Sequence, residues 1–392
     1  MIYVLWFLLG ILAYFNKNSK FVTLLITLFI LVVFSFSDSI PDLQAYQELY
    51  DYGIPHVKEP LYVYLNVLFK DIGISFYLFR FVIVFFALSL IISTIYRYSP
   101  YPTFVLYLYT IYPMSIDVVQ IRSFIAYAIV FFAFRFLVDF HKEKKVKYIL
   151  FFFVLIGIAT TLHYSCILYS ILGLLFFNFG NHKKLFFVLL PLFFILMTSN
   201  MNKIVPYVVN ILGWGKISNW IDSGKVYGII HVVRLILSRG LPLLLIVFVT
   251  FLKKSAFLKS EKLLDVNIFG SKCIYDKNFK GKMGDCPSQF YEVFVNRLLF
   301  ASVFLIFLFV FWEIHISTMY ERLNRLGLLF SYVLISRQIF CLEIKNKFIT
   351  HLLLLIMAAL CFCSVMFFME NYPGYYFFDA VFRQVMENNT LF

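Results

Sequence analysis

Charged residues are scarce in this chain. They make up 14% of its 392 residues, whereas soluble domains carry about 25%, so the composition excludes an ordinary water-soluble enzyme. The sequence has no P-loop and no HExxH or CxxC spacing, and so lacks the common signatures of ATP use and of zinc sites. Of the six cysteines, only Cys273 and Cys286 flank a polar loop, and no histidine lies beside them. We therefore expect neither a metal nor a cofactor.

Apolar residues are abundant instead: 62% of the chain is hydrophobic and 21% is aromatic. These residues gather in long runs, which predict transmembrane helices. The expected fold class is therefore all-α, a polytopic membrane protein with about twelve transmembrane helices. The first run has no basic residues before it and no small-residue cleavage site, so we interpret it as a retained span. The expected spans are 2–15, 21–36, 73–96, 101–114, 123–140, 148–162, 165–180, 185–199, 229–252, 293–312, 326–341 and 348–369.

Lysine and arginine fall in alternate connections between these runs, so the net charge of +13 indicates cytoplasmic loops and not nucleic-acid binding. The positive-inside rule then places both termini outside and makes 253–292 the largest cytoplasmic loop. Residues 1–392 are expected to form a single integral membrane domain, with interfacial helices and active-site loops facing outward. The outer loops are 37–72, 115–122, 200–228 and 313–325.

The first outer loop carries Asp42, Tyr46 and Tyr50, which are four residues apart and would share one face of a helix. Glu59 precedes a proline, which predicts an extended corner. Two interpretations fit these residues. The carboxylates could serve as a general base and its orienter or bind sugar hydroxyls, or the segment could be an interfacial helix with wet carboxylates and a belt of tyrosines.

Arg122 begins the apolar run 123–140 and follows Asp117 and Gln120. An arginine at a membrane boundary is expensive and therefore tends to be functional or paired. Its planar fork of donors suits phosphate, but it could equally anchor the helix by snorkelling to headgroups. His163 lies at the apex of a tight turn between two apolar runs, where a structural role and a catalytic role both fit.

A third group lies at the start of the run 229–252, where His231 and Arg234 share a helical face and Arg239 lies deeper. Arginines in the outer half of a span normally face the protein interior or a water-filled cavity. Late in the chain, Glu321 and Arg325 have the spacing of a local i, i+4 ion pair, which would leave Arg322 available. These groups predict recognition of an anionic lipid headgroup on the outer face.

Taken together, these short motifs resemble the EpsG family of Wzy-like bacterial polysaccharide polymerases. Five matching pieces extend the resemblance over nearly the whole chain. In one of them Leu61 follows Glu-Pro, where the family often has a small residue. Arg234 and Arg239 are not part of the family pattern. The matching pieces are Asp42-x-x-x-Tyr46-x-x-x-Tyr50, Glu59-Pro60-Leu61-Tyr62, Gln120-Ile-Arg122-Ser-Phe-Ile-Ala126, His163-Tyr-Ser165 and Glu321-Arg322-Leu323.

The resemblance implies a multi-pass protein of the bacterial plasma (inner) membrane that polymerises capsule, O-antigen or exopolysaccharide. Such a glycosyltransferase moves a growing glycan from undecaprenyl diphosphate to a hydroxyl of a new lipid-linked repeat unit. Its expected partners are this lipid-linked oligosaccharide, membrane lipids, a flippase and a chain-length regulator, with no nucleic acid. A lipid-linked oligosaccharide flippase or transporter and an O-antigen ligase are the alternatives. A transporter would place polar groups near the bilayer midplane, whereas here they gather at the outer ends of the runs.

Each candidate residue receives an expected role on this basis. The catalytic candidates are Glu59, Asp42 and His163. The diphosphate-binding candidates are Arg122, Arg234, Arg239 and Arg322, and the substrate-binding candidates are Gln120, Tyr46, Tyr50 and His231.

Overall fold

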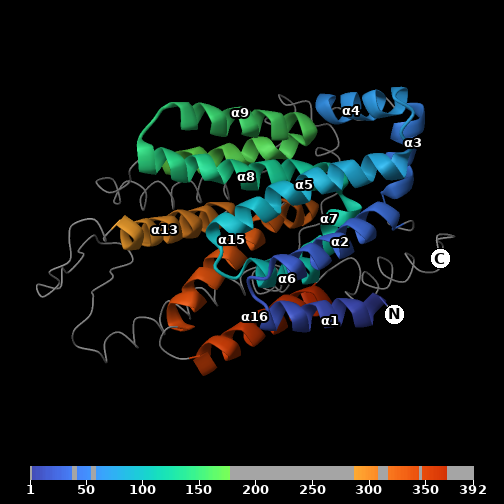
Figure 1. Ribbon diagram of the computed structural model, residues 1–392. Helices are drawn as coiled ribbons and strands as arrows, with labels where there is room; N and C mark the ends of the chain where they lie inside the picture. The colour runs from blue at the N-terminus through green and yellow to red at the C-terminus, as the bar shows by residue number, and fades with distance from the viewer. Residues whose placement is uncertain are drawn as a thin grey trace, which may run out of the picture.

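The computed structural model describes residues 2–37, 42–53, 59–176, 287–307, 317–343 and 347–368. Within these ranges every regular element is a helix, as Figure 1 shows, so the all-α fold class is confirmed for the described part of the chain. The expected runs at 185–199 and 229–252 lie outside it.

Most of the expected spans in the described part coincide with one helix each. The N-terminal half contains α1 (Ile2–Phe15), α2 (Lys20–Phe36), α5 (Phe76–Tyr98), α8 (Ile121–Glu143), α9 (Lys147–Leu162) and the 3-10 helix η1 (Tyr164–Phe176). The C-terminal half contains α13 (Pro287–Phe307), α15 (Ser317–Glu343) and α16 (Lys347–Phe368). Local sequence fixes several starts. For example, the Ser19 and Ser75 hydroxyls cap α2 and α5 by accepting from backbone amides three residues on.

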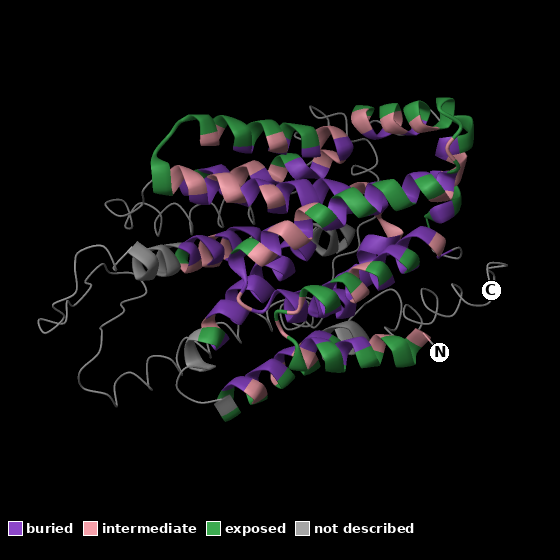
Figure 2. Cartoon of the chain, in the orientation of Figure 1, coloured by how far each residue is buried: buried purple, intermediate pink, exposed green. Residues whose placement is uncertain are grey.

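Two of these helices, α5 and α8, are long and apolar enough to cross a membrane. α8 lies inside the bundle, against α5, α9, η1 and α15. Large apolar side chains are exposed on the outer face of α5, among them Phe81, Phe85 and Phe86, and exposed residues also line the outer faces of α1 and α9 (Figure 2). A soluble protein rarely exposes so much apolar surface, so lipid contact explains it best. The full count of twelve spans stays a prediction.

The expected span at 101–114 differs from a simple membrane helix. α6 (Pro102–Ile111) is ten residues long, which gives about 15 Å of rise, half of a hydrocarbon core. All ten residues are buried, and Pro113 separates α6 from the six-residue helix α7 (Met114–Val119). α6 and α7 together return the chain between the end of α5 and the start of α8 (Figure 1).

The two ends of the bundle differ in chemistry. The α1–α2, α5–α6 and α8–α9 connections lie toward one end (Figure 1), where Arg97 pairs with Asp139 and the amide of Thr103 donates to the carbonyl of Lys17. The short helices α3 (Leu43–Tyr52) and α4 (Pro60–Asp71) lie at the opposite end with α7. The side of the membrane on which each end lies stays a prediction from the basic residues.

Candidate functional site

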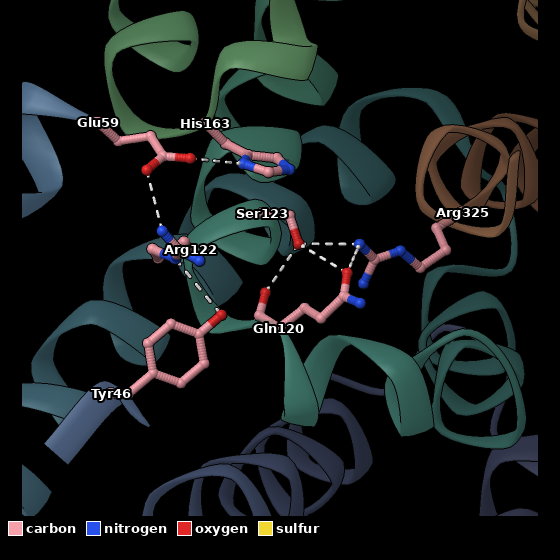
Figure 3. Close-up of polar contacts among 7 residues, drawn as sticks. All are labelled: Tyr46, Glu59, Gln120, Arg122, Ser123, His163 and Arg325. Carbon is pink, nitrogen blue, oxygen red and sulfur yellow. Dashed lines mark hydrogen bonds and ion pairs between the residues drawn. The ribbon is translucent and has the colours of Figure 1, made fainter. Parts of the chain in front are cut away.

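Glu59 is the N-cap of α4, and its position follows from the proline after it. Its backbone is extended (φ −80°, ψ 100°) and Pro60 occupies the first turn of the helix, as the sequence predicted. The carboxylate has two partners from distant parts of the chain. Oε2 accepts a hydrogen bond from Nη1 of Arg122 at 2.9 Å, and Oε1 lies 3.4 Å from Nδ1 of His163. Figure 3 shows the carboxylate between the guanidinium and the imidazole.

Arg122 lies in the first turn of α8 and is half-buried, with its side chain 24% exposed. Its Nε donates to the hydroxyl of Tyr46 at 3.5 Å. The guanidinium carbon lies 5.2 Å from the ring centroid of Tyr46 and 5.8 Å from that of Tyr62. A snorkelling anchor keeps its guanidinium in water, whereas this one is oriented by two rings and a carboxylate. The geometry therefore does not match a snorkelling anchor, and the anion-binding role of Arg122 stays a prediction.

The electrostatics of Glu59 bear on its role. Burial raises the pKa of this carboxyl, but the hydrogen bond to His163 and the positive charge of Arg122 outweigh burial, so the pKa lies below its ordinary value. Glu59 is therefore ionised at neutral pH. A general base works best with a pKa near the operating pH, so Glu59 is better suited to orient the imidazole than to accept the proton itself.

A second polar cluster surrounds Arg325 of α15, which is fully buried. Its Nη1 donates to Oδ1 of Asp117 at 2.6 Å, and its Nη2 donates to Oε1 of Gln120 and to Oγ of Ser123, both at 2.8 Å. The other oxygen of Asp117 accepts from the hydroxyl of Tyr109 at 2.9 Å. This cluster joins α15 to α6, α7 and the first turn of α8.

The two clusters meet at Tyr127 of α8. The guanidinium carbon of Arg325 lies 4.9 Å from the Tyr127 ring centroid, and the same ring packs edge-on against His163 with centroids 6.3 Å apart. His163 itself ends α9 in an extended conformation, at the turn where the sequence placed it. The imidazole therefore lies between Glu59 and Tyr127.

Four of the predicted site residues come together: Tyr46, Glu59, Arg122 and His163. Gln120 belongs to the other cluster and binds Arg325. Tyr50 is buried and its hydroxyl donates to the carbonyl of Ile74 at 2.6 Å, so its substrate role stays a prediction. In this structure Tyr50 packs α3 against α5.

The remaining candidates are not joined to this site by any described contact. Asp42 is exposed at the start of α3, without a side-chain cap bond, so its catalytic role stays a prediction. Arg322 belongs to α15, but its side chain lies outside the described residues, as do His231, Arg234 and Arg239 altogether. The local pair between Glu321 and Arg325 is not tested either, because the side chain of Glu321 is outside the described part.

Sequence reasoning missed two residues. Tyr62 is almost completely buried beneath Arg122, although the sequence offered it only as a member of the Glu59-Pro60-Leu61-Tyr62 motif. Arg325 was expected in a local pair, whereas its described hydrogen bonds join it to residues more than 200 positions away. The signal that could have found Arg325 is Asp117, because a carboxylate in an apolar segment requires a positive partner.

The arrangement offers a cation for an anionic group and a carboxylate-supported imidazole for a proton. In the part of the chain that the structure describes, no three histidine, cysteine, aspartate or glutamate side chains are grouped as metal ligands.

Comparison with known proteins places this site in context. Searches of curated proteins and of solved structures gave no match. The sequence model of the EpsG family, in contrast, matches residues 20–379. This range includes α2 to α16, both polar clusters and every candidate site residue. The chain belongs to the EpsG family, and this membership identifies it as a membrane protein of polysaccharide biosynthesis with a polymerase-like, glycosyltransferase-type function.

Proposed function

We propose that this protein is a polysaccharide polymerase of the bacterial plasma membrane. It transfers a growing glycan from undecaprenyl diphosphate to a hydroxyl of a new lipid-linked repeat unit at the outer face. The observation that carries the proposal is the cluster of Arg122, Glu59 and His163 at the end of the bundle where α3, α4 and α7 gather. It offers a cation and a base within one small site, which this transfer needs.

In the proposed reaction, a hydroxyl oxygen of the acceptor sugar forms a bond to the anomeric carbon of the donor glycan. The bond between that carbon and the diphosphate oxygen breaks, and the electron pair leaves with undecaprenyl diphosphate. Arg122 neutralises the charge that develops on the diphosphate, which is the type of stabilisation that often contributes most to catalysis. The fork of the guanidinium can bind two oxygens of the diphosphate at once.

His163 is the proposed base. Glu59 lies on the Nδ1 side of its imidazole, and a carboxylate in that position favours the tautomer with a proton on Nδ1. Nε2 is then the nitrogen that takes the proton from the acceptor hydroxyl. Glu59 is a positioning residue in this scheme, and Asp42 is the alternative base on the same face of the membrane.

The carboxylate of Glu59 competes with the donor diphosphate for Arg122. In the structure it occupies Arg122, so an arriving diphosphate must share or displace this carboxylate. Sharing is feasible because Arg122 has five N–H donors and its described bonds to Glu59 and Tyr46 use Nη1 and Nε. Arg234, Arg239 and Arg322 are the proposed further ligands of the diphosphate, and His231 and Gln120 of the glycan.

A deletion strain tests the proposal against its alternatives. If the protein is the polymerase, the strain accumulates a single repeat unit outside the membrane, and the wild-type gene restores long polymer. Single repeat units held inside would instead indicate a flippase, and long polymer left on its lipid would indicate a ligase. Either of these two results would overturn the proposal.

A further inference from the structure

We infer that Arg325 is a positioning residue for the transfer reaction: it holds the α7–α8 corner and thereby aims Arg122 and supports His163. The inference rests on the proposed function and concerns how the same site is held.

The first support is the set of groups that Arg325 binds. Its two terminal nitrogens bind Asp117 in α7, Gln120 at the junction, and Ser123 in the first turn of α8. Ser123 in turn donates to the carbonyl of Gln120 at 2.9 Å. One guanidinium from α15 therefore fixes the turn between α7 and α8, and Arg122 is the second residue of α8.

The second support is the direction of the side chains on α8. Ser123 and Tyr127 are four residues apart on α8 and so lie on one face of the helix, which faces Arg325. Gln120, the N-cap of α8, binds the same guanidinium. Arg122 is displaced by about 100° from Ser123 and reaches Glu59 on another side. Because Arg325 binds this face, it fixes the rotation of α8 about its axis and with it the direction in which Arg122 points.

The third support is the contact through Tyr127. The cation of Arg325 lies over one part of this ring, His163 packs against it edge-on, and Tyr169 of η1 packs at 5.6 Å. The ring is therefore held between the helix that supplies Arg325 and the turn that supplies His163. A substitution of Arg325 would therefore alter the packing of Tyr127 and, through it, the position of the His163 imidazole.

Burial distinguishes Arg325 from Arg122, whose side chain is 24% exposed. The side chain of Arg325 is 1% exposed and its Nη1 lies 2.6 Å from a carboxylate that is itself 5% exposed. A diphosphate could reach it only after the cluster had opened. The same bonds fix α15, which carries the predicted ligand Arg322, against α8, which carries Arg122.

The experiment uses variants of the full-length protein in lipid nanodiscs. The substrate is the lipid-linked repeat unit extracted from the deletion strain. The double substitution Asp117→Leu with Arg325→Met removes both buried charges together, because removing one alone leaves an unpaired buried charge. Arg325→Lys keeps a charge beside Asp117 but loses the fork that also reaches Gln120 and Ser123. Arg337→Lys is the matched control, since Arg337 is a buried arginine of the same helix that binds Asn296 and the carbonyl of Tyr98.

We expect turnover per folded molecule to fall about 10- to 100-fold in the double variant, because small misplacements of a positioned group have effects of this size. Inhibition by undecaprenyl diphosphate should weaken as well, because a misaligned guanidinium no longer presents the fork with which Arg122 binds two diphosphate oxygens. The Arg325→Lys variant should have a lower turnover than the wild-type protein without a matching decrease in unfolding temperature. The Arg337→Lys variant should keep the wild-type turnover.

Wild-type turnover in a folded double variant would overturn the inference and leave the proposed function intact. If the double variant does not fold, Arg325→Lys decides: wild-type turnover per folded molecule overturns the inference, and lowered turnover supports it. Failure of the proposed function would give a different result: the wild-type protein would make no polymer from these substrates, or the Arg122→Ala variant would remain active.

Discussion

The substitution Arg122→Lys keeps the positive charge at the start of α8 but removes the planar fork of donors. In the structure, Nη1 binds Glu59 at 2.9 Å while Nε lies 3.5 Å from the hydroxyl of Tyr46. An ammonium group can replace the bond to Glu59, but it cannot also stack on the rings of Tyr46 and Tyr62 and bind two diphosphate oxygens.

The expected size of the effect follows from the lost donor. A hydrogen bond to a charged group contributes about 1.5–3 kcal/mol, and each 1.4 kcal/mol changes a rate about tenfold. Arg122→Lys should therefore lower kcat/KM about 10- to 150-fold, and chain length on cells should fall with it. Arg122→Ala should abolish polymerisation, but it also leaves Glu59 without its cation, so lysine is the cleaner test.

Arg97→Lys is the matched control for this prediction. Arg97 also pairs with a carboxylate, that of Asp139, and lies over a tyrosine ring, that of Tyr98, at the opposite end of the bundle. The assay compares polymer length on cells and turnover of purified protein at equal protein level. Wild-type length and rate in Arg122→Lys would refute the diphosphate role and favour a membrane anchor.

His163→Gln should lower turnover about 100- to 10,000-fold, because it removes the proposed base. Glu59→Gln should lower turnover more than it lowers affinity for the lipid substrate. Full-length polymer in both variants would leave Asp42 as the better candidate base. Because the pKa of Glu59 lies below its ordinary value of 4.5, its carboxylate stabilises the fold above that pH, and this contribution is lost as pH falls through the folded-state pKa. On acidification, the unfolding temperature of the wild-type protein should therefore decrease by more than that of Glu59→Gln. Equal decreases in the two proteins would contradict the ion pair. Chelators should leave purified protein active, whereas loss of activity restored by one particular metal would show that arginine does not suffice. Reporter fusions should place position 55 outside and position 144 in the cytoplasm, and a cytoplasmic signal at 55 would reverse the topology.

Local features of this fold could be predicted from the sequence because each has a local cause. The apolar runs at 21–36 and 148–162 became α2 and α9 almost residue for residue. The corner at Glu59 was predictable because proline restricts the residue before it. The helix over Tyr46 and Tyr50 was predictable from their spacing.

The pairing of charges could not be predicted in the same way. Sequence spacing identifies partners one helical turn apart, but Glu59 and Arg122 are 63 residues apart, and Asp117 and Arg325 are 208 apart. The sequence grouped Gln120 with Arg122, because two residues separated by one position look adjacent. Gln120 is the cap residue between α7 and α8 whereas Arg122 lies within α8, and the structure divides them between two clusters.

The apolar composition of the run at 101–114 predicted a simple span, and the structure shows two shorter helices there. Its composition is as apolar as that of a membrane helix, but Pro113 ends the helix at ten residues and α7 follows. Burial of every residue of α6 by its neighbours explains the composition equally well. Hydropathy alone does not distinguish a helix that faces lipid from one enclosed by other helices.

The most direct test of the account is reconstitution of the purified protein in nanodiscs with lipid-linked repeat units from the deletion strain as the only substrate. The account predicts a ladder of glycans on lipid, with one undecaprenyl diphosphate released for each unit added, and it predicts that Arg122→Ala forms no ladder. A wild-type protein that leaves the single repeat units unchanged, or an Arg122→Ala variant that still builds the ladder, would contradict it.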